Sequence, residues 1–194
     1  MKTKLIAAAA FALLANTASA GVIVNGDFGT GDFTGWETEG EVMVTGTVET
    51  KIAALFAGRG TGLYTTISQA IELDAGDVLT GYAEFYAVDY LPYNDTSFVS
   101  IGGVTLFARD VANTGQSNST GPVKFSYTAA TAGVYQLVAG VANVGDNFNS
   151  SRLNVWDFAI ANANQVPEPG SIALFGLGLF GAAAARRKFA SKRG

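Results

Sequence analysis

The stretch "GLYTTISQAIELDAGDVLTGYAEFYAVDY", residues 62–90, holds two segments of alternating side chains on either side of a short turn. The first segment alternates Leu63, Thr65, Ile67 and Gln69 with Tyr64, Thr66, Ser68 and Ala70. Alternation with a period of two is typical of a half-buried strand, and "DAGD" at residues 74–77 is a turn signal. The stretch therefore predicts a strand, a turn and a second strand.

Short segments of the same kind recur on both sides of this stretch. They are residues 21–24 ("GVIV"), 41–48 ("EVMVTGTV"), 51–58 ("KIAALFAG"), 97–111, 121–129, 133–144 and 151–160. In the last segment we expect Leu153, Val155 and Asp157 on one face and Asn154, Trp156 and Phe158 on the other. About nine strands at spacings of roughly 8–12 residues predict an all-β fold, a jelly-roll β-sandwich over residues 21–160.

The residue inventory excludes several kinds of site. The chain has no Cys and no His, so it has no disulfide, no thiolate zinc site and no Ser-His-Asp triad. Residues 21–164 contain 15 acidic and five basic residues, an excess of negative charge that phosphates would repel. The sequence therefore predicts no nucleic-acid partner. A fold without disulfides can gain stability from a hard metal ion, which makes a calcium site worth seeking.

The first 20 residues have the three parts of a secretory signal peptide. Lys2 and Lys4 precede an apolar run, and "ASA" at residues 18–20 is a small-residue cleavage site. The apolar run is short for a membrane span, which needs roughly 20 residues. We therefore expect export, with cleavage after Ala20.

The last residues have a different three-part pattern. Residues 161–165 form a short polar linker, and "VPEP" follows at residues 166–169. The uncharged, mostly apolar residues 172–185 come next, and basic residues end the chain. This pattern predicts one hydrophobic helix whose basic end stays in the cytoplasm. Because proline holds its neighbourhood extended, residues 166–169 are expected to be accessible to a protease.

This ending resembles the PEP-CTERM proteins of Gram-negative bacteria. The matching residues are the Pro-Glu-Pro motif, the hydrophobic stretch 172–185 and the basic cluster: Pro167, Glu168, Pro169, Arg186, Arg187 and Lys188. The resemblance implies that residues 166–194 are a sorting segment processed by an exosortase, a membrane protease. It also implies a precursor held transiently in the inner membrane and then delivered to the cell surface or the extracellular matrix. An ordinary tail anchor is the alternative.

The central domain resembles the galactose-binding-like jelly rolls, which include carbohydrate-binding modules. The matching residues are Asn25, Gly26, Asp27, Phe28, Trp36, Ser68, Gln69, Ala75, Gly76, Asp77 and Asp157. In that group a structural calcium ion commonly links the first and last strands, and Asp27 and Asp157 are the candidates here. Gly29 stands where the group usually has an acid. The alternative is that Asp27 only caps a turn.

Candidate ligand-binding residues lie in one loop and at the two tryptophans. The loop "AVDYLPYNDTSF", residues 87–98, gathers carboxylates and aromatic rings around a proline: Asp89, Tyr90, Tyr93, Asn94 and Asp95. Aromatic faces beside polar groups suit sugars, so we expect contact with a sugar or with calcium here. The same residues could simply form a turn. Trp36 is a second candidate ligand residue, and Trp156 is considered as a ligand platform beside it. For both, a place in the core is the alternative.

These features favour a non-enzymatic envelope or extracellular-matrix protein, associated with exopolysaccharide or biofilm and sorted by an exosortase. The alternative is a carbohydrate-binding module acting on an extracellular glycan. A third hypothesis is that the protein binds ice. It predicts long arrays of Thr-x-Thr, and only Thr45 and Thr47 fit this pattern clearly. Glycosidases use paired carboxylates, and none of the 16 acidic residues lies in a recognisable catalytic motif.

Overall fold

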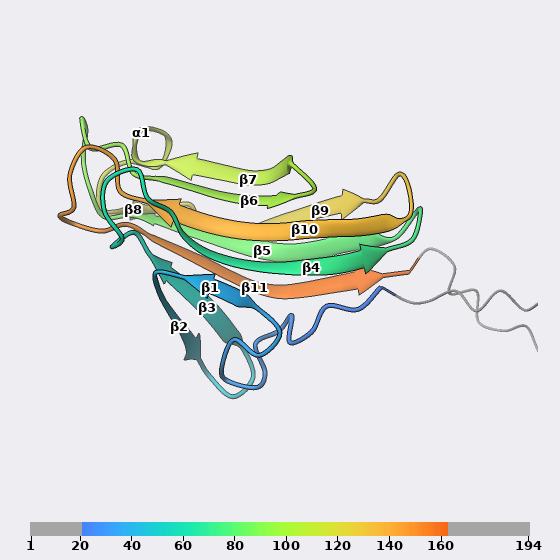
Figure 1. Cartoon of the computed structure of the whole chain (residues 1–194). Coiled ribbons are helices and arrows are strands. Elements are labelled where there is room, and N and C mark those ends of the chain that lie inside the picture. The colour runs from blue at the N-terminus through green and yellow to red at the C-terminus, as the bar shows by residue number, and fades with distance from the viewer. Residues whose placement is uncertain (1–20, 163–194) are drawn as a thin grey trace, which may run out of the picture.

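The computed structural model describes residues 21–162, which form two antiparallel sheets packed face to face (Figure 1). Sheet A has the order β1 (Glu37–Glu39), β4 (Thr65–Leu73), β10 (Gly133–Ala142), β6 (Thr96–Ile101) and β7 (Val104–Asp110). Sheet B has the order β2 (Glu41–Gly46), β3 (Lys51–Phe56), β11 (Arg152–Ala161), β5 (Val78–Ala87) and β8 (Asn118–Ser119), and β9 (Val123–Thr128) also pairs with β5.

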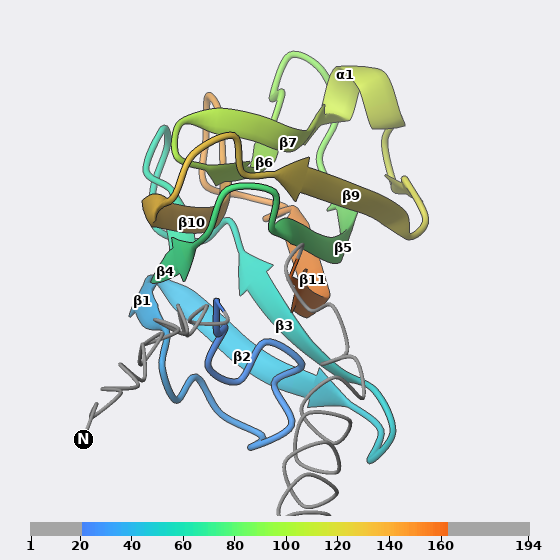
Figure 2. The same cartoon turned by 90° about the vertical axis from the view of Figure 1, so that its right-hand side faces the viewer.

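The chain alternates between the two sheets along most of its length. It passes from β3 to β4, β5 and β6, and later from β9 to β10 and β11, changing sheet at each step. Figure 2 shows the two layers from a second side. Such crossings are typical of a jelly roll, and the predicted all-β sandwich is confirmed. The helix α1 (Val111–Thr114) is a single turn between β7 and β8.

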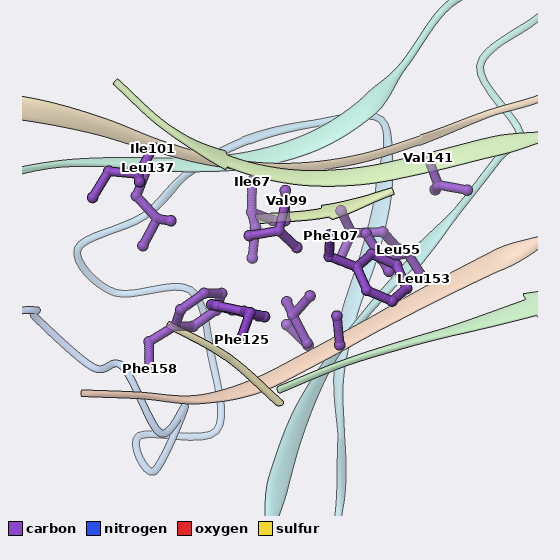
Figure 3. Close-up of a cluster of buried hydrophobic side chains, with 14 of the residues drawn as sticks. Leu55, Ile67, Val99, Ile101, Phe107, Phe125, Leu137, Val141, Leu153 and Phe158 are labelled. Carbon is purple, nitrogen blue, oxygen red and sulfur yellow. The ribbon is translucent and has the colours of Figure 1, made fainter. Parts of the chain in front are cut away.

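Alternating rows of apolar side chains from both sheets fill the space between them. In β5 the buried residues Leu79, Ala83 and Phe85 alternate with less buried ones. Figure 3 shows the rows of sheet A facing those of sheet B, and the labelled core residues are Leu55, Ile67, Val99, Ile101, Phe107, Phe125, Leu137, Val141, Leu153 and Phe158. The period-two pattern of the sequence therefore decides which face of each strand is buried.

Residues 21–36 do not form the short apolar strand expected at residues 21–24. The Gln69 side chain takes the place of a partner strand: its Oε1 accepts from the Val24 N–H, and its Nε2 donates to the Val24 and Gly35 carbonyl oxygens. The prediction of a strand here was wrong because a side chain satisfies these backbone groups. The segment instead places Phe28, which is fully buried, in the core.

A β-bulge changes the faces of β11. The pairing with β5 shifts between Trp156 and Ala159, and Asp157 has a φ of +53°. Beyond the bulge, Phe158 points inward and is only 4% exposed, although the alternation predicted it beside Trp156. The extra residue shifts the period by one, and that part of the prediction was wrong.

The bulge also docks the N-terminal segment. The Phe158 N–H donates to the Gly26 carbonyl oxygen at 3.0 Å. A Cβ at position 26 would lie 2.3 Å from the Phe158 carbonyl oxygen, so only glycine permits this approach. The rings of Phe28, Trp36, Phe125 and Phe158 then pack together. We call these four residues the aromatic end of the core.

Candidate functional site

The outer side of sheet B carries a compact grid of aromatic and polar side chains. Three residues of β11 lie directly opposite three of β5 in the strand register: Arg152 opposite Tyr86, Asn154 opposite Glu84, and Trp156 opposite Tyr82. They alternate with core residues such as Leu153, so all six point away from the core. We call these six residues the β5–β11 face.

Two stacked rings form one end of the β5–β11 face. The Tyr82 and Trp156 rings lie 5.5 Å apart, centroid to centroid, at an interplanar angle of 10°. Lys124 of β9 holds its ammonium 5.8 Å from the Tyr82 ring centroid. Both rings are partly exposed. Stacking occupies one face of each ring, so the pair presents ring edges and the outer face of Trp156 beside the hydrogen-bonding groups. A partly exposed aromatic face with polar neighbours suits the C–H groups of a sugar.

A cation and a ring form the other end. The Arg152 guanidinium carbon lies 4.2 Å from the Tyr86 ring centroid. Removal from water raises the pKa of Tyr86 above its ordinary value, and the nearby Glu84 carboxylate adds to this. The Tyr86 hydroxyl therefore stays protonated at neutral pH and can donate a hydrogen bond.

The polar groups of the β5–β11 face are Glu84 and Asn154 between the two ends and Arg152 at one of them, and two of these residues have a polar atom without a partner in the described residues. Glu84 Oε1 accepts a hydrogen bond from the Ser119 hydroxyl at 2.5 Å. Asn154 is only 6% exposed, yet its Oδ1 has no partner in the described part of the protein, and neither has Arg152 Nε. Buried polar groups are nearly always hydrogen-bonded, so this acceptor and this donor would gain from a polar ligand. Both atoms are enclosed by the protein, and a ligand would reach them only after a movement of the side chains around them.

A hollow adjoins this face at Tyr86. Its volume is about 410 Å³, and its lining residues are Tyr86, Ala87, Val88, Ser117, Asn118 and Ser119. This size is within the range of small-molecule sites. The β5–β11 face therefore continues from the ring stack, across the polar groups, into an open hollow with serine and asparagine side chains.

Trp36 does not lie on an accessible surface. Its ring is 7% exposed and packs 5.4 Å from the Phe28 ring and 5.2 Å from the Phe158 ring, centroid to centroid. Its Nε1–H donates to the Asn25 carbonyl oxygen. Trp36 offers no free face to a sugar, and the structure favours the alternative that it belongs to the core.

The structure separates the candidate residues of the loop after β5. The Tyr90 ring is 43% exposed and meets the Tyr93 ring edge to face, whereas Asp95 is fully buried. The Asp95 carboxylate accepts from the backbone N–H groups of Val144 and Ser151. Removal from water raises the pKa of Asp95 more than these hydrogen bonds lower it. Asp95 therefore links loops, and Tyr90 and Tyr93 remain candidates for ligand contact.

The two proposed calcium ligands lie beside the same backbone hydrogen bond. Gly26 accepts from Phe158, and Asp27 and Asp157 are their immediate neighbours. Both are exposed, and Asp27 Oδ1 also accepts from the Gly29 N–H, as in the turn-capping alternative. Among residues 21–162 no group of three or more His, Cys, Asp or Glu side chains is arranged to hold a metal ion. The pair would need backbone carbonyls and water to complete a calcium shell.

The face assembled by β5 and β11 was not predicted from the sequence. Tyr82, Glu84 and Tyr86 alternate within β5, a signal that a strand has a polar and aromatic outer side. This signal does not say which strand lies alongside, and the face exists only because β11 is that neighbour. Trp156 was considered and Asn154 was not.

The predicted sorting residues Pro167, Glu168, Pro169, Arg186, Arg187 and Lys188, the signal peptide at residues 1–20 and the linker beyond residue 162 lie outside the described residues. The part of the chain that is described contains no helix with the length and apolar character of a membrane span.

Comparison with known families tests the sorting prediction directly. A model described as the PEP-CTERM protein-sorting motif matches residues 165–188. This confirms the motif, which implies an exported protein with a membrane-anchored precursor that an exosortase processes. No curated protein matches the chain.

Several solved structures share the general architecture. TmCBM61, solved in complex with β-1,4-galactotriose, is 18% identical over 74% of this chain and 99% of its own, with a TM-score of 0.48. A family 16 carbohydrate-binding module is 16% identical over 72% of this chain and 99% of its own, with a TM-score of 0.45. A cyclase from Fischerella sp. TAU is 13% identical over 70% of this chain and 98% of its own, with a TM-score of 0.41.

Proposed function

We propose that this protein is an exported envelope or matrix protein whose β-sandwich binds an extracellular polysaccharide through the β5–β11 face. The observation that carries the proposal is the stacked, partly exposed Tyr82–Trp156 pair. Beside it lie Asn154 and Arg152, whose buried polar atoms have no partners in the described residues and would meet a ligand once the side chains covering them move. The rings supply an apolar surface for sugar C–H groups, and the amide, guanidinium and Glu84 carboxylate supply hydrogen bonds for hydroxyls.

The length of the face favours a chain of several sugars over a single one. Tyr82 and Tyr86 are four residues apart on one strand, which corresponds to roughly 13 Å. An aromatic ring at each end and polar groups between them suit an extended ligand lying along β5. The hollow beside Tyr86 would take the next unit or a branch.

The charge of the face suits an extracellular polysaccharide that is neutral or acidic. Residues 21–164 have 15 acidic and five basic residues, so most of the domain repels anions. Two of those five bases, Lys124 and Arg152, lie over rings of this face. Local positive charge reduces the repulsion that an anionic polymer would meet elsewhere on the domain.

The role proposed here is binding without catalysis. The β5–β11 face holds one carboxylate, Glu84, whereas most glycoside hydrolases act with two. After processing by the exosortase, the domain would be held at the cell surface or in an exopolysaccharide or biofilm matrix of a Gram-negative bacterium. Incubation with the bound polysaccharide, followed by analysis for shorter products, tests this part, and any turnover would contradict it.

Calcium at Asp27 and Asp157 is a separate structural proposal. An ion there would reinforce the contact between the N-terminal segment and β11 that Gly26 and Phe158 already make. Thermal unfolding with and without a chelator tests it, using Asp27→Asn as the variant. If the chelator lowers the Tm of the wild type and of Asp27→Asn equally, calcium is not bound by Asp27 and Asp157.

Affinity electrophoresis through gels containing polysaccharides tests the binding proposal. The full-length chain should be retarded by at least one polysaccharide, ideally the exopolysaccharide of its own bacterium, and Trp156→Ala or Tyr86→Ala should abolish the retardation. The matched control is Tyr64→Ala, since Tyr64 is 37% exposed and lies outside sheet B.

The same experiment distinguishes the β5–β11 face from the loop after β5. If Tyr90→Ala and Tyr93→Ala abolish retardation while Trp156→Ala leaves it unchanged, the site is the loop and the proposed face is wrong. If no polysaccharide retards the wild-type chain, the binding proposal fails as a whole.

A further inference from the structure

The end of the core opposite the aromatic end is closed by polar side chains. The inward rows of four strands continue past their last apolar residue into Asp89 after β5, Ser151 before β11, Asn143 after β10 and Asp95 before β6. All four residues are fully buried. We call them the polar end of the core. Figure 1 shows the loop after β5 and the loop between β10 and β11 meeting at this end, on the left of the view.

Hydrogen bonds place these four residues next to one another. Asp95 Oδ1 accepts from the Val144 N–H at 3.0 Å, and its Oδ2 accepts from the Ser151 N–H at 3.2 Å. The Ser151 hydroxyl oxygen accepts from the Val88 N–H. Asp89 is the residue after Val88, so it lies near Ser151. In the sheet register Ala142 lies opposite Thr96, so Asn143 and Asp95 are the next opposite pair.

Two oxygen atoms in this cluster lack partners. Asp89 Oδ1 accepts from the Tyr90 N–H, but Asp89 Oδ2 is buried and has no hydrogen-bond partner in the described residues. Asn143 Nδ2 donates to the Ser150 hydroxyl, but Asn143 Oδ1 is likewise buried and unpartnered. An amide and a carboxylate from different loops therefore each leave one acceptor over.

The charge of the cluster is also unbalanced. Within residues 21–162 neither Asp89 nor Asp95 forms an ion pair with a Lys or Arg side chain. The two carboxylates are close enough for the charge of Asp89 to act on Asp95. Burying two neighbouring anions without a cation is costly, and leaving their acceptors unpartnered adds to that cost.

We propose that the polar end is a calcium site in which Asp89 Oδ2, Asn143 Oδ1 and the Asp95 carboxylate are ligands. Calcium takes six to eight oxygen ligands, tolerates irregular geometry and uses carboxylates, amide oxygens and backbone carbonyls. Each Asp95 oxygen has a further lone pair beyond the one that accepts a backbone N–H. The ion would neutralise both buried charges and satisfy both unpartnered oxygens.

This site is separate from the Asp27 and Asp157 pair and from the β5–β11 face. Asp27 and Asp157 are exposed and adjoin the aromatic end, and Asp157 lies in the middle of β11, whereas Ser151 precedes its first residue. The ion at the polar end would instead join the loop after β5 to the loop between β10 and β11. Binding of a polysaccharide and binding of this ion are therefore independent claims.

Terbium luminescence and thermal unfolding test the proposal on the full-length chain in detergent, after treatment with a chelator. Terbium replaces calcium, and the nearby Tyr90 and Tyr93 would sensitise its emission. We expect a saturable signal that calcium displaces, and a rise in Tm of roughly 5–10 °C at a hundredfold excess of calcium over its Kd. Asp89→Asn should weaken terbium and calcium binding at least tenfold.

The matched control is the double variant Asp27→Asn with Asp157→Asn, which should keep the terbium signal and a calcium-dependent rise in Tm. If calcium does not change the wild-type Tm, or if its effect survives Asp89→Asn but is lost in the control, the proposal is wrong. Should Asp89→Asn fail to fold, Asn143→Asp gives a second test. A third carboxylate should tighten binding, and unchanged or weaker binding would contradict the site.

Discussion

The two tryptophans of this chain lie in regions that use aromatic rings in opposite ways. At the aromatic end, Trp36 packs against Phe28 and Phe158, and its N–H donates to a backbone carbonyl. On the β5–β11 face, Trp156 stacks on Tyr82 beside Asn154 and Arg152, which keep unpartnered polar atoms. One region satisfies its polar groups within the protein, and the other has polar groups without partners beside a partly exposed ring stack. The difference separates a structural tryptophan from a binding one.

The largest effect on stability is expected at the aromatic end. Trp36→Ala should lower the free energy of unfolding by about 3–5 kcal/mol, because it removes a large buried ring and leaves a cavity. Chemical denaturation followed by circular dichroism measures this. Trp156→Ala is the matched control and should cost much less. Equal losses for the two variants would show that the two regions do not differ in this way.

A smaller loss is expected where the N-terminal segment meets the bulge. Gly26→Ala would place a Cβ 2.3 Å from the Phe158 carbonyl oxygen, so the segment must move away. We expect a loss of about 1–3 kcal/mol in the free energy of unfolding. Gly133→Ala is the matched control for loss of a glycine, because Gly133 does not have a positive φ and its Cβ would meet only the Tyr135 ring, at an ordinary contact distance of 3.9 Å. A tolerated Gly26→Ala would mean that the docking is looser than described.

Much of this fold follows from the sequence. The alternation of side chains in residues 62–90 is enough to locate β4 and β5, because a strand with one buried face has an apolar side chain at about every second position. The bulge at Asp157 could not be predicted, because it depends on the pairing of β11 with β5, about 75 residues away in the chain. The same pairing creates the β5–β11 face. The sequence therefore could not predict this candidate site, for the same reason that it predicted the wrong side of the strand for Phe158. The loss of the first strand depends on Gln69, which is 45 residues from Val24.

On the β5–β11 face a substitution should raise stability and reduce function. Asn154→Leu removes a buried amide whose Oδ1 lacks a partner, and it keeps a similar volume. We expect a gain of up to about 1 kcal/mol in the free energy of unfolding, since unpartnered buried groups are costly. Binding of polysaccharide should fall at least tenfold. Loss of stability with unchanged binding would indicate that Asn154 is structural.

The smallest effect is expected from removing one charge at the edge of the face. Lys124→Gln should leave the free energy of unfolding within about 0.5 kcal/mol of the wild type, because Lys124 is exposed. If the ligand is an acidic polysaccharide, its binding should weaken and become less sensitive to salt. Affinity electrophoresis at two salt concentrations measures this. Binding that is unchanged by both salt and substitution would indicate a neutral ligand.

The most direct test of the central claim is the fluorescence of Trp156 during titration with the polysaccharide that retards the protein. In a Trp36→Phe variant, Trp156 is the single tryptophan left in the chain. We predict a saturable change in its emission, with a midpoint equal to the Kd measured independently, because the sugar covers this ring. A polysaccharide that binds with unchanged Kd and leaves the Trp156 emission unaltered would contradict the proposal that the β5–β11 face is the binding site.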